Sequence, residues 1–420
     1  MGECNGGPSA APWARWCGAA LSGLALVAVA TPSHAQDTAA SEDASIAADA
    51  PVEIHGFVSQ GFILGIQNEY LARSKRGSVE FSEAGINFTK PLTSNLRAGL
   101  QLFAHDLGPL GNYRTQFDWY YLAYHATDWL GVRVGRIKVP FGLYNELNDI
   151  DVARVPILLP QSIYQADHRE YLFAQTGGEV YGDIALPGAG SLEYRVYGGT
   201  LSSDLPRTAP EGVTVADVRV PYLYGGRLLW YTPLEGLAAG MSGQGVRFDV
   251  DYRLDADYLA GLQAEGLVPP EQGAELPVKL RVIRWVASLQ YAAYDWELSA
   301  EYSRWAGDIY SRTPEFLPPH LVNERYYVMA SYRLSPWFTP GVYYSGFFAN
   351  VDERKGHENY QHDVAATTRF DLNAHWLLKL EGHLMRGTAA LDNPTLNGGA
   401  NRADLEPTWG MLLAKTTAYF

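Results

Sequence analysis

The chain has 420 residues, a formal net charge of −14 and two cysteines, Cys4 and Cys17. This acidic balance excludes nucleic acid as an expected partner, because phosphate binding requires a basic surface. After residue 35 no apolar run reaches the roughly 18 residues that a transmembrane helix needs. If the chain sits in a membrane, it must therefore cross as a β-barrel.

Residues 1–35 have the pattern of a cleaved secretory signal peptide. Arg15 supplies a positive charge, residues 19–30 are apolar, and Ser33-His34-Ala35 fits a small-x-small cleavage site. Both cysteines lie in this segment, so the exported chain is expected to hold together without disulfides. A closed barrel and a soluble periplasmic protein both remain possible on this evidence. We interpret residues 36–53 as an acidic flexible segment and residues 54–420 as the folded domain.

Strands with a period of two follow along the whole domain. Apolar and polar residues alternate over residues 95–105, 296–303, 362–372 and 376–384. This period predicts strands with one face buried and one face in a different environment. A soluble sandwich would alternate in the same way, so the connections between strands have to decide.

Short and long connections alternate along the chain. The short ones are residues 90–94, 127–129, 187–190, 232–236 and 335–337, and the long ones are residues 65–78, 141–170, 200–218, 250–276, 307–321, 350–358 and 387–403. Short periplasmic turns and long outer loops are typical of transmembrane barrels. The sequence therefore predicts an all-β, transmembrane antiparallel β-barrel of about 16 strands, with both chain ends on the periplasmic side.

Tyrosine and tryptophan make a second argument for a membrane. Trp129, Trp230, Trp296, Trp337 and Trp376 all border short turns, where the aromatic girdle of a barrel lies. Aromatic residues are also common in ordinary strands. However, the number of them that lie beside short turns favours the girdle.

One long connection interrupts this regular pattern. A strand beginning at Val132 breaks at Pro140-Phe141-Gly142, and about thirty residues follow without a clear period. Irregular loops of this length are usually functional. We expect this loop to fold into the barrel lumen and narrow the pore. The candidate constriction residues are its charged side chains: Glu146, Asp149, Asp151, Arg154, Asp167 and Arg169.

Charged residues on the polar face of the strands are expected to line the lumen. A basic side chain on the lipid face near the bilayer midplane would cost about 2–4 kcal/mol, so strand parity sorts charges inward. The candidate pore-lining residues are Arg97, Arg133, Arg195, Arg227, Arg284, Arg369, Lys379, Asp118, Glu179 and Glu301. Any one of them could also be an ordinary solvated charge or a weak cross-strand ion pair.

Several segments resemble bacterial outer-membrane porins, most closely the phosphate-selective-porin-like group of 16-stranded barrels. They are His55-Gly56-Phe57-Val58, GRIKVPFG at residues 135–142, GGRLLWYTP at residues 225–233, and the terminal Phe420. The resemblance implies an outer-membrane location, recognition of Phe420 by the barrel-assembly machinery, and a homotrimer. Phosphate selectivity is not carried over, because acids outnumber bases in residues 141–170.

The expected function is therefore a porin: a water-filled channel for passive diffusion of ions and small hydrophilic solutes through outer-membrane lipid. Rings of acids favour cations and rings of bases favour anions. Acids on the loop facing bases on the wall would create a transverse field, and we expect a weak cation preference set by Asp149, Asp151 and Arg154. The alternative is an anion- or phosphate-selective porin.

Other classes of function have weaker support. A barrel enzyme would need a nucleophile or base beside a histidine, and only Asp167-His168 and His357, His362 and Asp363 invite that interpretation. There is no Gly-x-Ser-x-Gly and no metal-ligand spacing. We expect no enzyme activity, no metal and no cofactor. A soluble all-β binding protein and an adhesin with long acidic loops remain alternatives.

Overall fold

The structure is a computed structural model that describes residues 51–169, 173–201, 212–266, 268–311, 320–391, 393 and 395–420. The predicted signal peptide, residues 1–35, and most of the predicted acidic segment lie outside the described residues.

Sixteen antiparallel strands form one closed barrel. They are β1 (Glu53–Ile66), β2 (Phe81–Pro91), β3 (Leu96–Leu107), β4 (Gln116–Thr127), β5 (Leu130–Lys138), β6 (Ala174–Leu186), β7 (Gly190–Thr200), β8 (Val213–Tyr231), β9 (Leu237–Leu254), β10 (Glu275–Ala293), β11 (Trp296–Ser311), β12 (His320–Tyr332), β13 (Phe338–Phe348), β14 (Tyr360–Asn373), β15 (Trp376–Gly387) and β16 (Thr408–Tyr419). The predicted fold class and strand number are confirmed.

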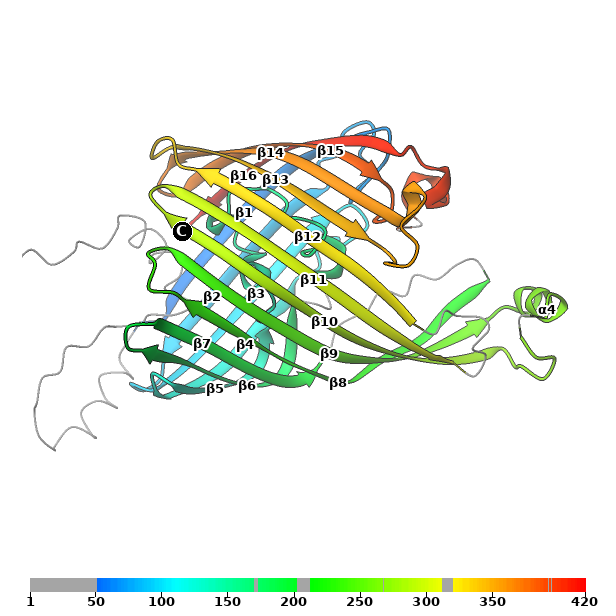
Figure 1. The fold of residues 1–420 in the computed structure, drawn as a ribbon, viewed down its shortest axis with the longest axis horizontal. Helices are drawn as coiled ribbons and strands as arrows, with labels where there is room; N and C mark the ends of the chain where they lie inside the picture. The colour runs from blue at the N-terminus through cyan, green and yellow to red at the C-terminus, as the bar shows by residue number, and fades with distance from the viewer. Residues whose placement is uncertain are drawn as a thin grey trace, which may run out of the picture.

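The two chain ends close the barrel. Strand β1 pairs with β16, and Phe57 lies opposite Tyr419. The pairing continues past the strand end, because the Gly56 N–H donates to the Phe420 carbonyl at 3.1 Å and the Phe420 N–H donates back at 3.0 Å. The first and last strands are thus neighbours in the sheet, and neither is left as a free edge along the paired residues. The C-terminus lies at the end of the barrel that carries the short turns (Figure 1).

Long and short connections alternate as predicted, with three additions. Two are short turns, residues 294–295 between β10 and β11 and residues 374–375 between β14 and β15. Residues 108–115, between β3 and β4, form a further connection at the long-loop end. The sequence pattern missed it because its eight residues are short for an outer loop. Gly108 and Gly111, at φ of 56° and 78°, make its tight bends possible.

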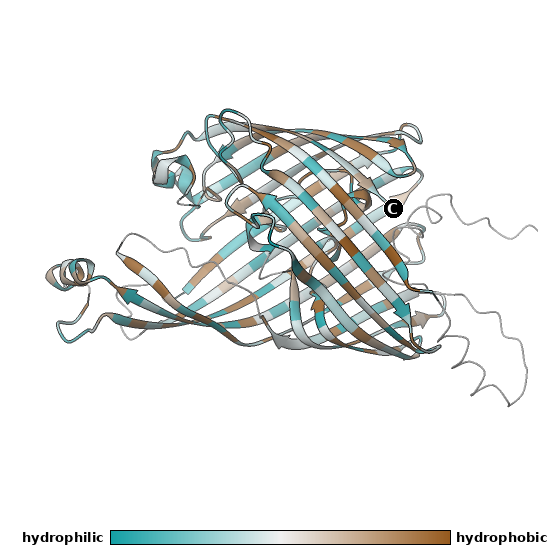
Figure 2. Ribbon diagram, turned by 180° about the vertical axis from the view of Figure 1, so that it is seen from behind, coloured by the Kyte–Doolittle hydropathy of each residue, from teal (hydrophilic) through white to brown (hydrophobic). Residues whose placement is uncertain are grey.

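The outer face of the barrel is apolar and the inner face is polar. Val58, Leu380 and Leu412 are 63%, 46% and 50% exposed on the outside, whereas their inward neighbours Ser59 and Lys379 are buried. Figure 2 shows the resulting alternation of apolar and polar residues along the strands. This is the inverse of a water-soluble domain and follows from the period of two.

Three strands rise well above the rest. Strands β8, β9 and β10 have 19, 18 and 19 residues and extend past the rim as an arm, with helix α4 (Ala256–Ala264) at its tip (Figure 1). The sequence pattern predicted a loop over residues 250–276 and missed α4, which is short and packs only Leu262 firmly, against Leu254 and Val268. None of the described helices is long and apolar enough to span a membrane.

Candidate pore constriction

The connection between β5 and β6 runs through the inside of the barrel (Figure 1). Proline 140 has no N–H for the β5–β6 ladder, and Gly142 turns the chain at φ of 62°. The loop returns to its start, because the Val139 N–H donates to the Phe173 carbonyl at 2.8 Å. Between these ends it forms short 3-10 turns η1 (Asn145–Leu147), η2 (Asp151–Ala153) and η3 (Ala166–His168). We call residues 139–173 the constriction loop.

Apolar side chains pack the constriction loop against one half of the wall. Phe141, Tyr144, Leu159, Ile163 and Tyr164 are buried in a single cluster. The wall contributes Tyr197, Leu223, Val246, Val286 and Tyr327 from strands β7 to β12. Each fully buried side chain of this size contributes roughly 1.5–3 kcal/mol, so packing makes a large contribution to the position of this part of the loop.

Glu146 binds the wall at β7 and β8. Its carboxylate accepts a hydrogen bond from Arg195 at 2.6 Å and lies 3.0 Å from Arg227. Arg195 also pairs with Glu179 on β6. Burial acts to raise the pKa of Glu146, but Arg195 and Arg227 outweigh it and lower that pKa to about 2. Four predicted site residues therefore meet in one buried ion-pair network.

Asp149 binds the wall at β3 and β5. Lys138 donates to its two carboxylate oxygens at 2.7 and 2.9 Å, and Gln101 donates at 2.7 Å. Burial acts to raise the pKa of Asp149, and the charges of Lys138 and Arg169 outweigh it and lower that pKa. Neither Lys138 nor Gln101 was predicted as a site residue. Lys138 could have been predicted, because it is a basic residue at the end of a strand, directly before the loop.

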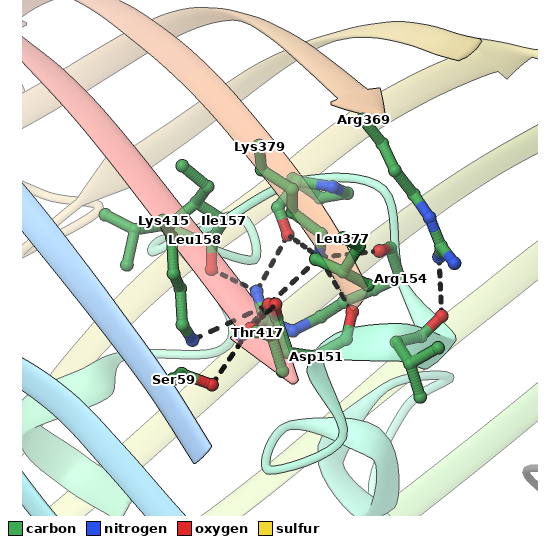
Figure 3. A network of polar contacts seen from close by, with 12 residues as sticks. Ser59, Asp151, Arg154, Ile157, Leu158, Arg369, Leu377, Lys379, Lys415 and Thr417 are labelled. Atoms are coloured by element: carbon green, nitrogen blue, oxygen red, sulfur yellow. Dashed lines mark hydrogen bonds and ion pairs between the residues drawn. The ribbon is translucent and has the colours of Figure 1, made fainter. Parts of the chain in front are cut away.

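Asp151 binds the seam between β15, β16 and β1 (Figure 3). Its carboxylate accepts hydrogen bonds from Lys379 at 2.9 Å and from Thr417 at 2.7 Å, and Lys415 lies 3.6 Å away. Thr417 in turn shares a hydrogen bond with Ser59 of β1 at 2.9 Å. Burial acts to raise the pKa of Asp151, but Lys379 and Lys415 hold it well below its usual range.

Strand β15 holds the loop backbone as well as its side chains. The Lys379 ammonium donates to the carbonyls of Asp151 and Arg154 at 2.7 and 2.8 Å. Two residues further along, the Glu381 carboxylate accepts the N–H groups of Ile157 and Leu158 at 2.7 and 2.9 Å. A carboxylate holding two successive backbone donors fixes the segment's position and orientation.

His383 completes the inner face of β15. Its imidazole lies between the carboxylates of Glu381 and Asp363, 3.0 Å from each. The regular spacing of Lys379, Glu381 and His383 on one strand face was visible in the sequence. Nothing in the sequence indicated that Lys379 and Glu381 bind the loop, or that His383 contacts Glu381.

Glu301 and Arg284, both predicted to line the pore, also support the loop. The Glu301 carboxylate accepts hydrogen bonds from the Leu143 N–H and the Tyr327 hydroxyl, both at 2.9 Å, and from the Tyr164 hydroxyl. The Arg284 guanidinium stacks on the Phe141 ring at 3.9 Å. Both side chains are 3% exposed, so they are buried between the wall and the loop.

The remaining constriction candidates lie apart from one another. Arg154 is 3.6 Å from Asp151, and Arg169 is 2.8 Å from Asp118 on β4. Burial acts to lower the pKa of Arg169, and Asp118 outweighs it and raises that pKa. Asp167 lies in η3 on the long-loop side, where it lines a small cavity with Asn397.

Arg97, Arg133 and Arg369 face the lumen on the short-turn side of the loop and are partly exposed. Arg133 lies 3.4 Å from Glu179, and Arg369 lies 2.7 Å from Asp371. Arg369 also donates to the Val152 carbonyl of the loop, at 2.5 Å.

The structure separates His362 from Asp363, one of the histidine–carboxylate pairs suggested by the sequence. The imidazole of His362 stacks on Tyr344, while Asp363 points to the opposite face and meets His383. His357 lies 3.9 Å from Glu358. The side chain of His168 lies outside the described part of the chain. Among the described residues, no group of three or more His, Cys, Asp or Glu side chains could hold a metal ion.

The fold is that of bacterial outer-membrane porins. An anion-selective porin from Comamonas acidovorans matches at a TM-score of 0.53 and 13% identity, over 88% of this chain and 99% of that one. The trimer form of OmpT from Vibrio cholerae matches at 0.55 and 10%, over 88% and 99%. The channel DcaP of Acinetobacter baumannii matches at 0.52 and 12%, over 88% and 97%.

Searches at the level of sequence find nothing comparable: no family model and no curated protein matches the chain. At these identities the structural matches establish the fold. The function has to be argued from the site.

Proposed function

We propose that this protein is an outer-membrane porin that lets ions and small hydrophilic solutes diffuse passively through its lumen. The observation that carries the proposal is the constriction loop: it lies inside a closed 16-strand barrel and is tied to the wall at Glu146, Asp149 and Asp151. A loop fixed at several points around a barrel sets a defined minimum width, which is what a selective diffusion channel requires.

The proposed location is the outer membrane. The apolar outer face fits lipid, residues 1–35 would be the cleaved signal peptide, and the short-turn end would face the periplasm. Phe420 would be the residue that the barrel-assembly machinery recognises. Trimeric OmpT supports a homotrimer as the assembled form.

The ion preference we propose is weak and toward cations. The chain carries a net charge of −14, and acids outnumber bases in the loop. However, Glu146, Asp149 and Asp151 contact wall bases directly, so their fields are confined to close pairs instead of crossing an open eyelet. This pairing removes most of the transverse electric field expected from the sequence. The ion preference would then be set by the less buried charges.

The proposed family is the phosphate-selective-porin-like group, without its selectivity. An anion preference would have to come from the partly exposed bases Arg97, Arg133 and Arg369 on the short-turn side. The anion-selective Comamonas porin shares the barrel, so the fold itself is compatible with either sign.

The test is single-channel recording of the refolded mature protein in a planar bilayer under a KCl gradient. We expect discrete conductance steps and a small reversal potential of cation-selective sign. An anion-selective sign would overturn the proposed preference and leave the channel intact. A protein that folds and inserts yet gives no steps would overturn the channel itself.

A further inference from the structure

The polarity of the strands inverts where β9 and β10 leave the barrel. Within the barrel, inward residues are polar, such as the directly paired Gln244 and Arg284, and outward residues are apolar, such as Ile283. Above this level, Arg247 and Asp249 point outward and Val246, Phe248 and Val250 point inward. Outward charges are expected of strands that stand in water. Inward apolar residues are not expected of a lumen that should be polar.

The inward residues form a continuous surface. Val246, Phe248 and Val250 of β9 lie directly opposite Val282, Leu280 and Val278 of β10. We call these six residues the apolar strip. The middle row extends to β11, where Ile309 lies opposite Leu280. Directly opposed side chains are in contact range, so the rows present one apolar face.

The apolar strip leads to the constriction loop. At its lower end Val246 is buried in the cluster that holds Phe141 and Tyr164 of the loop, and Phe248 and Val282 pack against the same cluster. Higher up, Phe248, Val250, Leu280 and Ile309 remain partly exposed. A solute entering from the long-loop end would therefore pass this surface before it reaches the narrowest level.

The size of the strip indicates what it can hold. Its two strands and three rows cover about 10 by 20 Å, or about 200 Å². A stable protein interface buries about 800 Å² on each partner. The strip is too small for a protein partner and large enough for several aromatic rings or alkyl groups.

We infer that the apolar strip is a binding site for small solutes that carry an aromatic ring or a short alkyl chain, which it concentrates above the constriction loop. This rests on the proposed channel function and adds a solute class to it. Partial burial of one ring would strengthen binding about tenfold over a polar analogue with the same charge.

The test is block of the single-channel KCl current by benzyltrimethylammonium, with choline as the polar analogue carrying the same cationic head. Each probe is added first to one side of the bilayer and then to the other. We expect half-block by benzyltrimethylammonium from the long-loop side at a concentration about tenfold below that for choline. The F248Q/L280Q variant should lose most of this difference. The matched control Tyr310→Gln, on the outer face beside Ile309, should keep it.

The outcomes are separable. Absence of any KCl steps in the unmodified protein is failure of the proposed channel function. Normal steps with equal block by the two probes, or with block unaffected by F248Q/L280Q, overturn the apolar strip as a solute site alone. If F248Q/L280Q changes the oligomer size in detergent and not the block, a second copy of the chain covers the strip, which also overturns the inference.

Discussion

At the scale of single residues, the site is dominated by buried charges that have partners. Breaking such a pair by removing one member leaves the other charge buried and unpaired, which typically costs about 3–5 kcal/mol. Lys379 is 0% exposed and pairs with Asp151 at 2.9 Å. Lys415 is 1% exposed and pairs with Glu83 at 2.6 Å and, at 3.6 Å, with Asp151. The effect of a substitution in the constriction loop should therefore depend mainly on the wall charge that loses its partner.

We expect the double variant Asp149→Asn, Asp151→Asn to shift ion selectivity toward anions. It removes two acids from the lumen and leaves Lys138 and Lys379 without their carboxylates, while Lys415 keeps Glu83 at 2.6 Å. The reversal potential under a KCl gradient measures the shift. A matched control is Asp249→Asn on the outer face of the arm, which should leave the potential unchanged. An unaltered potential in the double variant would contradict the role of both aspartates.

Glu146 should make stability depend on acid pH. Its pKa is about 2 in the folded protein against 4.5 for the free group. A carboxylate whose pKa is lowered by folding contributes stability that is fully present above pH 4.5 and is lost as the pH falls toward 2. The contribution to the free energy of unfolding is about 3 kcal/mol. Unfolding in urea at pH 6 and at pH 3 measures the loss, which should be smaller in Glu146→Gln. Equal losses in the two proteins would refute the assignment.

At the scale of elements, the constriction loop is separable from the barrel that holds it. Its two ends meet at Val139 and Phe173, 2.8 Å apart from nitrogen to oxygen. Replacing residues 140–172 with a four-residue Gly-Ser linker should therefore preserve the β5–β6 pairing. It should raise the single-channel conductance several-fold, because the linker no longer obstructs the lumen. Unchanged conductance in a folded variant would mean that another segment sets the minimum width.

The strands and the loop were predictable to different degrees. Alternation and turn lengths are local signals, so the barrel and its strand number follow from the sequence. The loop's position was expected from its irregular length, but its partners were not. Asp151 meets Lys379 and Thr417, which lie 228 and 266 positions away. Parity alone shows that these residues face inward; only the closed barrel determines which strands lie beside the loop.

At the scale of the whole molecule, the proposed location in the outer membrane predicts that one band of the outer surface meets lipid and that the arm stands outside this band. Leu380 is 46% exposed on the outer face of β15, near the middle of that strand. Leu380→Arg should destabilise the barrel in vesicles by about 2–4 kcal/mol. Tyr310→Arg, on the outer face at the end of β11, should change stability by less than about 1 kcal/mol. Urea titration of folding into vesicles measures the free energy of unfolding of both variants. Equal destabilisation would contradict the placement of the lipid-facing band.

The meeting of Gly56 with Phe420 also orders events during assembly. The last strand to be synthesised supplies the partner of the first, and it supplies Lys415 and Thr417 to Asp151 of the constriction loop. A chain that stops before residue 408 therefore keeps two open sheet edges, and its loop is held at the seam by β15 alone, without Lys415 and Thr417. Open edges invite pairing with other chains. Pairing of β16 with β1 would thus close the barrel wall and complete the seam contacts of the constriction loop together, and a truncated product would show both defects at once.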